Sequence, residues 1–197
     1  MRAFVLATAN PHKTEEMSAV LSGLDIEVIA RPGHVGEIDE TEDTLEGNAL
    51  LKARALVEAT GRAAIADDTG LFVDALEGRP GVFSARYAGE SATYAENVDK
   101  LLAELSEVED RRAHFRTVIA LVAPDGDELV VEGVLDGVIT REPRGENGFG
   151  YDPVFAPDDT PGRTLAELTS GEKNVLSHRA RALRALAEKL AAEPRRF

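Results

Sequence analysis

The chain has 197 residues, with 36 acidic and 22 basic side chains and a formal net charge of −14 at pH 7. This excess of negative charge repels a polyanion, so we do not expect nucleic acid as a partner. The absence of cysteine excludes disulfides, thiolate metal sites and a cysteine nucleophile. With 43% hydrophobic and 29% charged residues, the chain is predicted to form one globular domain over residues 1–197. No apolar run approaches the roughly 18 residues of a membrane span, so a cytoplasmic protein without a membrane partner is expected.

The first elements are predicted from apolar runs and the breaks between them. Phe4 to Ala7 is expected to form a short buried strand, and residues 25–30 a second one. An acidic loop over residues 37–43 leads into a helix over residues 44–60, with Gly61 as its stop. The helix between the two strands is indicated by apolar side chains at helical spacing: Met17, Val20, Leu21 and Leu24.

The second half of the chain continues the alternation of strands and helices. A buried strand is expected over residues 63–66, a helix over 96–105, and a long hairpin of residues 114–123 and 128–140 joined by a Pro-Asp-Gly-Asp turn. Ser177 is a good N-cap for the last helix. The inward face of that helix is predicted to carry Ala180, Leu183, Ala187 and Leu190. The pattern predicts an α/β fold in which helices flank a mixed sheet.

The segment TANPHK, Thr8 to Lys13, lies where the first strand gives way to a helix. Free backbone N–H groups and the helix dipole favour an anion at such a junction. The side chains of Thr8 and Asn10 and the ammonium of Lys13 would suit phosphate oxygens. The alternative is a plain Asn-Pro turn followed by a solvated lysine.

Two adjacent carboxylates, Asp67 and Asp68, follow the strand over residues 63–66. Neighbouring residues of an extended chain point to opposite sides, so the two need not share one task. One of them could bind a metal or activate water while the other orients a neighbour. An Asx-turn after the strand is the alternative reading.

The acidic loop and Lys52 bear on a metal or phosphate site. Oxygen ligands from separate segments are what Mg²⁺ takes, together with waters and substrate phosphates. A solvated acidic loop is the alternative. Lys52 falls on the otherwise apolar face of its helix, so it either extends past the core or is directed into a polar cleft.

A glycine-rich aromatic loop, GFGYDP over residues 148–153, could form a base-stacking wall with a polar edge, or a plain loop with an inward Phe. Lys173, and His178 with Arg179 at the start of the last helix, add cations and an imidazole. His178 by itself could equally be structural. Together these pieces outline a nucleotide site.

In this order, the motifs resemble the inosine/xanthosine triphosphate pyrophosphatase family, which hydrolyses non-standard purine nucleoside triphosphates. The resemblance covers nearly the whole chain. One departure is Gly47, where many members carry an acidic residue or Gln. The matching segments are residues 8–13 (TANPHK), 48–53 (NALLKA), 66–71 (ADDTGL), 80–87 (PGVFSARY), 148–153 (GFGYDP) and 177–179 (SHR).

The resemblance implies an elongated mixed sheet flanked by helices, two lobes with a central cleft, a Mg²⁺ cofactor and a homodimer. It implies that the segment Thr8, Ala9, Asn10, Pro11, His12 and Lys13 binds the triphosphate. Asp68 would be the general base, Glu40 and Asp67 would help it to hold Mg²⁺, and Lys52 would support the phosphates. The residues expected to bind the nucleoside are Thr69, Phe149, Gly150, Tyr151, Asp152, Lys173, His178 and Arg179.

The predicted reaction is Mg²⁺-dependent hydrolysis of ITP, dITP or XTP between the α- and β-phosphates, giving the monophosphate and pyrophosphate. A hydrogen-bond donor near His178 and Arg179 is expected to recognise the purine O6. Two other functions remain open. One is a purine nucleotide sensor that does not hydrolyse its ligand, and the other is a pyrophosphatase for modified pyrimidine nucleotides.

Overall fold

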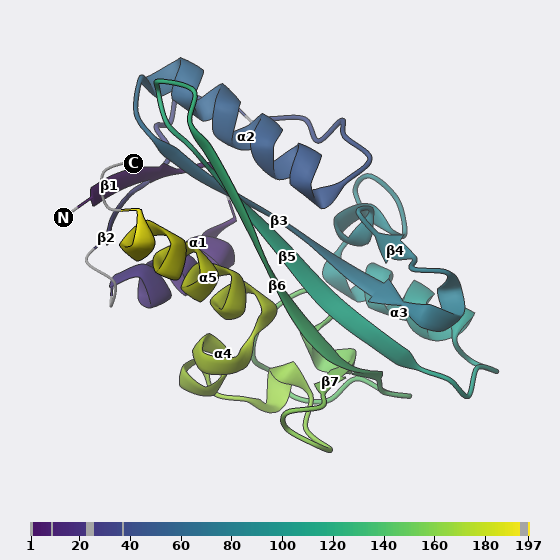
Figure 1. Ribbon diagram of the computed structural model, residues 1–197. Helices are drawn as coiled ribbons and strands as arrows, with labels where there is room; N and C mark the ends of the chain where they lie inside the picture. The colour runs from purple at the N-terminus through teal and green to yellow at the C-terminus, as the bar shows by residue number, and fades with distance from the viewer. Residues whose placement is uncertain (1, 9, 23–25, 37, 194–196) are drawn as a thin grey trace. The chain divides into compact units, whose positions relative to one another are not determined.

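The computed structural model describes residues 2–8, 10–22, 26–36, 38–193 and 197. Over these residues the strands form one mixed sheet of seven strands in the order β2-β1-β3-β5-β6-β7, with β4 paired to β3 (Figure 1). The strands are β1 Arg2–Leu6, β2 Ile26–Ile29, β3 Ala64–Val73, β4 Pro80–Gly81, β5 Arg112–Val122, β6 Glu128–Ile139 and β7 Phe155–Pro157. The α-helices are α1 Pro11–Leu21, α2 Leu45–Thr60, α3 Tyr94–Glu104, α4 Ser170–Leu176 and α5 His178–Ala192. The predicted α/β fold with a mixed sheet is confirmed.

The chain divides into two compact units. The first comprises residues 1–68, 117–133 and 179–197, and the second comprises residues 69–116 and 134–178. The boundaries fall inside β3, β5 and β6 and after His178, the first residue of α5.

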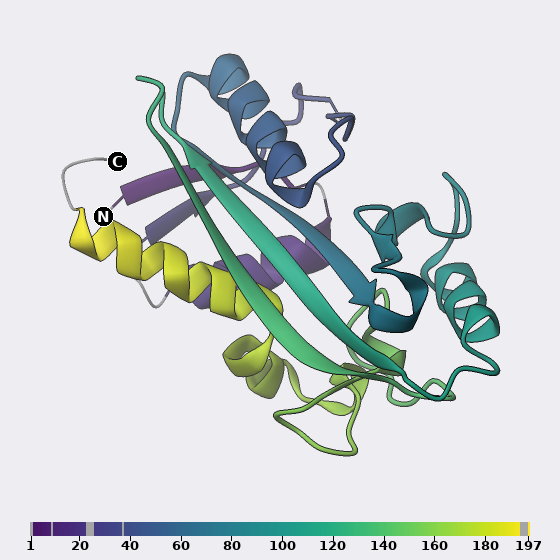
Figure 2. The ribbon, with the colours of Figure 1, turned by 45° about the vertical axis from the view of Figure 1, so that its right-hand side comes forward.

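The first unit is built on parallel strands. β1 pairs in parallel with β2 and with β3, and the register sets Leu6 beside Ile65. Figures 1 and 2 both draw α2 on one side of these strands and α1 with α5 on the other. The core beneath α1 and α5 is apolar and includes Phe4, Leu6, Met17, Leu21, Ile65, Ile119, Leu183 and Leu186.

Capping residues set the ends of the helices in the first unit. Asn10 caps α1, because its side-chain oxygen accepts from the backbone N–H groups of His12 and Lys13. Thr44 caps α2 in the same way through the N–H of Gly47. The α2 helix ends at Gly61 in the left-handed conformation, as predicted.

The second unit has its own core. It is formed by the parts of β3, β5 and β6 that belong to this unit, together with α3 and the segment around β7. Its buried members include Leu71, Val73, Val98, Leu101, Phe115, Leu135, Tyr151, Phe155 and Leu165. The predicted helix over residues 96–105 is α3, which begins two residues earlier because Thr93 and Glu96 form a capping box. The predicted hairpin corresponds to β5 and β6, and the Ala123 N–H donates to the Asp127 carbonyl at the turn.

Two sequence predictions need adjustment. The strand expected over residues 63–66 extends from Ala64 to Val73, so Asp67 and Asp68 lie inside it rather than after it. An Asx-turn at this position is therefore wrong. Predictions for Ala9, Leu24, Asp25 and Glu37 concern positions outside the described residues.

Candidate active site

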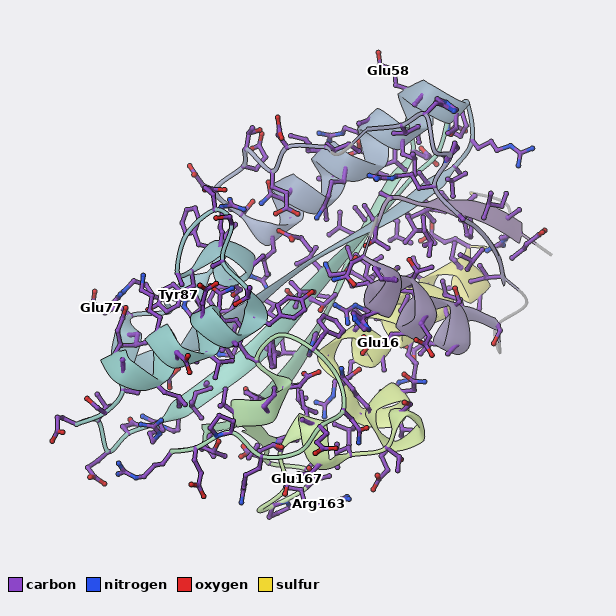
Figure 3. All side chains as sticks on the ribbon, turned by 180° about the vertical axis from the view of Figure 1, so that it is seen from behind. Glu16, Glu58, Glu77, Tyr87, Arg163 and Glu167 are labelled. Carbon is purple, nitrogen blue, oxygen red and sulfur yellow. The ribbon has the colours of Figure 1, made fainter. Side chains whose placement is uncertain are left out.

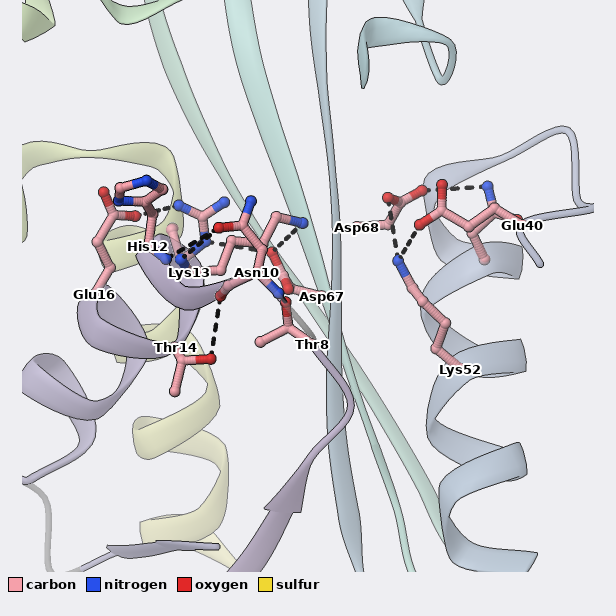
Figure 4. A network of polar contacts seen from close by, with 12 residues as sticks. Thr8, Asn10, His12, Lys13, Thr14, Glu16, Glu40, Lys52, Asp67 and Asp68 are labelled. Atoms are coloured by element: carbon pink, nitrogen blue, oxygen red, sulfur yellow. Dashed lines mark hydrogen bonds and ion pairs between the residues drawn. The ribbon is translucent and has the colours of Figure 1, made fainter. Parts of the chain in front are cut away.

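Asp67 and Asp68 occupy the middle of β3, where successive side chains alternate between the two faces of the sheet. Figure 4 shows Asp67 directed toward α1 and Asp68 directed toward α2. The prediction that the two carboxylates point to opposite sides is confirmed. Both are buried, with 3% of Asp67 and 5% of Asp68 exposed, so each carboxylate depends on protein groups for its stabilisation.

Asp68 shares one lysine with a second carboxylate. The Lys52 Nζ lies 3.3 Å from Asp68 Oδ1 and 2.6 Å from Glu40 Oε1. Lys52 is therefore directed toward two acidic groups, which answers the question that its place on the apolar face of the helix raised. Glu40 is half-buried, whereas Asp39, Glu42 and Asp43 in the same loop are exposed.

Asn48 fixes the acidic loop beside Asp68. Its side-chain nitrogen donates to Asp68 Oδ2 at 3.2 Å, and its side-chain oxygen accepts from the backbone N–H of Glu42 at 3.0 Å. The loop also packs closely on α2, because a Cβ at Gly47 would meet the Glu42 Cβ at 2.7 Å. The glycine that departs from the family pattern therefore allows the close approach of the loop.

The pKa of Asp68 is set by its burial and by two charged neighbours, the acid Glu40 and the cation Lys52. Burial raises the pKa of the Asp68 carboxyl, and the neighbouring Glu40 raises it further, while Lys52 acts in the opposite direction. Burial alone would lower the pKa of Lys52, but Asp68 and Glu40 together raise it. Lys52 therefore keeps its charge, and Asp68 is a better proton acceptor than an ordinary aspartate.

Asp67 contacts two cations, whereas Asp68 contacts one cation that it shares with a second acid. Its Oδ2 is 3.1 Å from Lys13 Nζ and 3.3 Å from Arg179 Nε, and Arg179 also binds Glu16 on α1, which is labelled in Figure 3. Burial favours the neutral acid, but Lys13 and Arg179 hold the pKa of Asp67 far below its usual range. Asp67 therefore stays ionised and forms ion pairs with two cations, Lys13 and Arg179.

Parallel pairing explains why the predicted phosphate segment meets Asp67. Because Leu6 lies beside Ile65, the residues after β1 run alongside the middle of β3. Lys13 is consequently held by Asp67, with 18% of its side chain exposed, and the solvated-lysine alternative is wrong. Asn10 is a helix cap, in agreement with the turn alternative, and its N–H donates to Thr8 Oγ1. Pro11 and His12 are exposed.

The predicted metal ligands separate into two places. Glu40 and Asp68 meet around Lys52, whereas the carboxylate of Asp67 is turned to the other face of β3. Within the described ranges, no group of three or more His, Cys, Asp or Glu side chains is placed to hold a metal ion. Two carboxylates still fit Mg²⁺, because this ion commonly binds one or two of them and completes its octahedron with waters and substrate phosphates. The Lys52 ammonium shows that a cation is accommodated between these two acids.

A second polar cluster lies in the second unit, at the glycine-rich aromatic loop. Asp152, with 3% exposed, accepts from Lys173 Nζ at 2.6 Å and from the Phe149 N–H at 2.9 Å. The Lys173 ammonium lies 4.8 Å from the centroid of the Phe149 ring. The structure therefore brings together three of the residues predicted to bind the nucleoside.

The remaining predicted nucleoside ligands have other surroundings. The hydroxyl of Tyr151 donates to the Ser84 carbonyl at 2.9 Å, and only 5% of Tyr151 is exposed. His178 stacks on Phe115 with a centroid distance of 4.6 Å, and it is 4% exposed. Thr69 is half-buried in β3, and Gly150 has a positive φ of 64° that favours glycine. Tyr151 and His178 thus contact the protein interior.

Two residues with contacts in the site were not among the sequence predictions. Asn48 binds Asp68, and Glu16 binds Arg179. Asn48 had a recognisable signal, because it precedes Lys52 by one helical turn and lies on the same largely apolar face of α2. Glu16 had none, since its partner lies 163 positions away in the sequence.

Among the described residues, no helix combines the length and apolar character that crossing a membrane requires.

Comparisons with known proteins agree on one family. The model of the Ham1 family matches residues 4–189. A dITP/XTP pyrophosphatase of Thermoanaerobacter sp. (strain X514) is 54% identical over 183 residues, which cover 91% of each chain. A dITP/XTP pyrophosphatase of Bacillus subtilis (strain 168) is 47% identical over 196 residues, which cover 98% of each.

Solved structures show the same similarity. A HAM1 protein from Coxiella burnetii has a TM-score of 0.87 and 45% identity, covering 98% of this chain and all of the other. A nucleoside-triphosphatase / dITP/XTP pyrophosphatase from Mycobacterium abscessus has a TM-score of 0.75 and 48% identity, covering 93% and 98% of the two chains. The likeness therefore extends over sequence and fold together.

Proposed function

The chain belongs to the Ham1 family, and from this premise we propose that it is a nucleoside triphosphate pyrophosphatase acting on dITP, XTP and ITP. The reaction releases the nucleoside monophosphate and pyrophosphate. Relatives with nearly half or more of their residues identical carry the name dITP/XTP pyrophosphatase. The observation in this chain that carries the proposal is the buried Asp68 carboxyl, which shares the charge of Lys52 with Glu40.

Asp68 is proposed to accept the proton of the attacking water. A general base works best when its pKa lies closer to the working pH than that of a free carboxylate. Burial and the neighbouring Glu40 shift the pKa of Asp68 in this direction. Asn48 holds the other carboxylate oxygen, which leaves Asp68 little freedom to rotate. The water would then attack with the base already in position.

Lys52 and the segment from Thr8 to Lys13 are proposed to hold the phosphates. Lys52 keeps its positive charge beside Asp68, so it can stabilise negative charge that develops on a phosphate oxygen. Lys13 is ordered by Asp67 at the first turn of α1, where backbone N–H groups also favour an anion. The contribution of Ala9 to this segment remains a prediction.

Glu40 and Asp68 are the residues proposed to hold Mg²⁺, and Asp67 as a third ligand stays a prediction. When bound, the ion would supply positive charge to the phosphate oxygens around the scissile bond. Lys52 lies between the same two acids, so it must give way or share their oxygens when an ion binds.

For the nucleoside we propose direct contacts with Phe149 and Gly150, and direct contacts with the buried Asp152 and Lys173 stay predictions from the resemblance. Phe149 is half-buried and offers an aromatic face, and Asp152 with Lys173 holds the loop in one conformation. Tyr151 and His178 are proposed to position this loop, because both are engaged in the interior of the second unit. Thr69 and Arg179 as nucleoside ligands stay predictions from the resemblance, as do O6 recognition, the homodimer, the cytoplasmic location, the single domain and the central cleft.

The test is a product analysis. The purified protein is incubated with Mg²⁺ and, in separate reactions, with dITP, XTP, ITP, GTP, ATP and a panel of modified pyrimidine triphosphates. Monophosphate and pyrophosphate from dITP, XTP and ITP, lost on addition of EDTA, are the expected result. Nucleotide binding without turnover would instead indicate the sensor, and preferential turnover of pyrimidines would indicate the third function. Release of diphosphate and single phosphate would contradict the proposed bond cleavage.

A further inference from the structure

Tyr94 is an exposed aromatic residue beside the aromatic loop of the second unit. It is the first residue of α3, 45% of it is exposed, and its ring centroid lies 6.0 Å from that of Phe149 at an interplanar angle of 41°. Phe149 itself is half-buried and has the Lys173 ammonium over its ring. The two rings lie side by side and retain exposed surface, so they form an apolar patch, and the buried Lys173 ammonium lies over the Phe149 ring.

The backbone that carries Tyr94 is held firmly. Thr93 and Glu96 form a reciprocal capping box around the first turn of α3, with bonds of 2.7 to 3.2 Å. Asn97, one turn further on, accepts from the Ala88 N–H and donates to the Ala85 carbonyl. Tyr94 is thus an aromatic side chain presented from a rigid element, which is the arrangement that gives a binding contact its precision.

Building on the proposed function, we infer that Tyr94 is a further nucleobase-contacting residue and forms one aromatic surface with Phe149. A purine ring has an apolar face that stacks on aromatic side chains whatever its edge substituents. The rings of Phe149 and Tyr94 then supply the surface on which the purine stacks, while Asp152 and Lys173 fix the loop that carries Phe149. Tyr94 contributes to the affinity for the base and not to the chemistry at the phosphates.

Steady-state kinetics with dITP and Mg²⁺ test this role. Tyr94→Ala is expected to raise KM by about tenfold, which lies within the range of one base–aromatic contact, and to leave kcat within about twofold. Tyr94→Phe keeps the ring and is expected to restore the KM. Val138→Ala is the matched control, because Val138 is 40% exposed in the same unit and is expected to leave both constants unchanged.

Tyrosine fluorescence gives a readout that a merely structural role would not move. The chain has three tyrosines and no tryptophan, and the hydroxyls of Tyr87 and Tyr151 bind Glu104 and the Ser84 carbonyl respectively. Titration with inosine monophosphate, the product of ITP hydrolysis, is expected to quench the emission of the wild type. In Tyr94→Phe the quenching is expected to disappear, although the same nucleotide still competes with dITP.

The outcomes separate the inference from the proposed function. If the wild type hydrolyses dITP and Tyr94→Ala keeps the wild-type KM, the inference alone is wrong. Quenching that persists in Tyr94→Phe would have the same meaning. If the wild type neither hydrolyses dITP nor responds to inosine monophosphate, the proposed function and the inference are both wrong.

Discussion

Asp67 and Asp68 are neighbours in the same strand and both are buried, yet their surroundings drive their protonation in opposite directions. Asp67 contacts two cations, Lys13 and Arg179, and its pKa is lowered. Asp68 shares the single Lys52 with a second acid, and its pKa is raised. Because burial is nearly equal, the difference lies in the neighbouring charges, which are two cations beside Asp67 but one cation and a second acid beside Asp68.

This contrast assigns different roles to two identical side chains. Where the environments of two acids push their pKa values apart, the ionised one serves as a fixed charge and the other exchanges protons. Asp67 can thus order cations on the side of α1, while Asp68 is suited to activate water on the side of α2. A substitution at Asp68 is therefore expected to lower activity, and a substitution at Asp67 is expected to lower stability.

The largest effect on activity is expected for Asp68→Asn. Loss of the general base should lower kcat by about 100-fold or more, measured with saturating dITP and Mg²⁺. Stability should not fall at neutral pH. Because the folded state raises the pKa of Asp68, its favourable contribution exists at low pH and is lost as the pH rises through that value. A variant with near wild-type kcat would contradict the assignment.

The largest effect on stability is expected for Asp67→Asn. Arg179, of which 2% is exposed, and Lys13 would keep their charges without this carboxylate. The free energy of unfolding should fall by about 3–5 kcal/mol in urea denaturation, as when one partner of a buried pair is removed. Arg54→Ala is the control, because its pair with Glu128 is exposed and should matter by less than about 1 kcal/mol. Equal losses of unfolding free energy in Asp67→Asn and Arg54→Ala would show that the buried ion pairs of Asp67 contribute no more than an exposed pair.

The acid stability of the protein should also follow Asp67. Because the folded state lowers the pKa of Asp67, the stabilisation is present above the ordinary pKa of an aspartate and is lost as the pH falls below it. Urea midpoints of the wild type and Asp67→Asn should therefore converge toward low pH. A difference that stays constant from about pH 4 down to about pH 2 would show that the charge of Asp67 is not the cause.

A smaller effect is expected for Asn48→Ala, which removes the link between Asp68 and the acidic loop. Leaving the buried Asp68 carboxylate without the amide should lower the free energy of unfolding by about 1–3 kcal/mol in urea denaturation. The kcat/KM for dITP should also fall, because Asp68 is no longer held in position. Glu58→Ala is the matched control on α2, since Glu58 projects outward in Figure 3 and is exposed. An unchanged kcat/KM in Asn48→Ala would mean that Asp68 is positioned without it.

The smallest effect is a shift of the pH profile. The kcat/KM of the wild type should rise with pH through the raised pKa of Asp68, because only the ionised carboxylate accepts a proton. Glu40→Gln removes a charge that raises this pKa, so the acidic limb should move to lower pH. Lys52→Met removes the main charge that lowers it, so the limb should move to higher pH. Shifts of the same sign in both variants would contradict the shared-cation model.

Local patterns in the sequence were enough for part of this site. Strand periodicity predicted the opposite directions of Asp67 and Asp68, and helix periodicity placed Lys52 on an otherwise apolar face. Caps at Thr44 and Gly61 agree with the predicted limits of α2. The order of the motifs indicated the family. Each of these depends on residues within a few positions of one another, where backbone geometry alone decides.

Tertiary structure decided which partner each side chain meets. The segment after β1 reaches Asp67 because of the register of Leu6 with Ile65, and Arg179 reaches Asp67 across 112 positions of sequence. The same packing turned Tyr151 and His178 inward and extended β3 through both aspartates. The TANPHK segment thus indicated an anion site by itself, but the pairing of Lys13 depended on a parallel strand some sixty residues away. Such long-range contacts determine pKa values, because charge and burial depend on neighbours in space rather than along the chain.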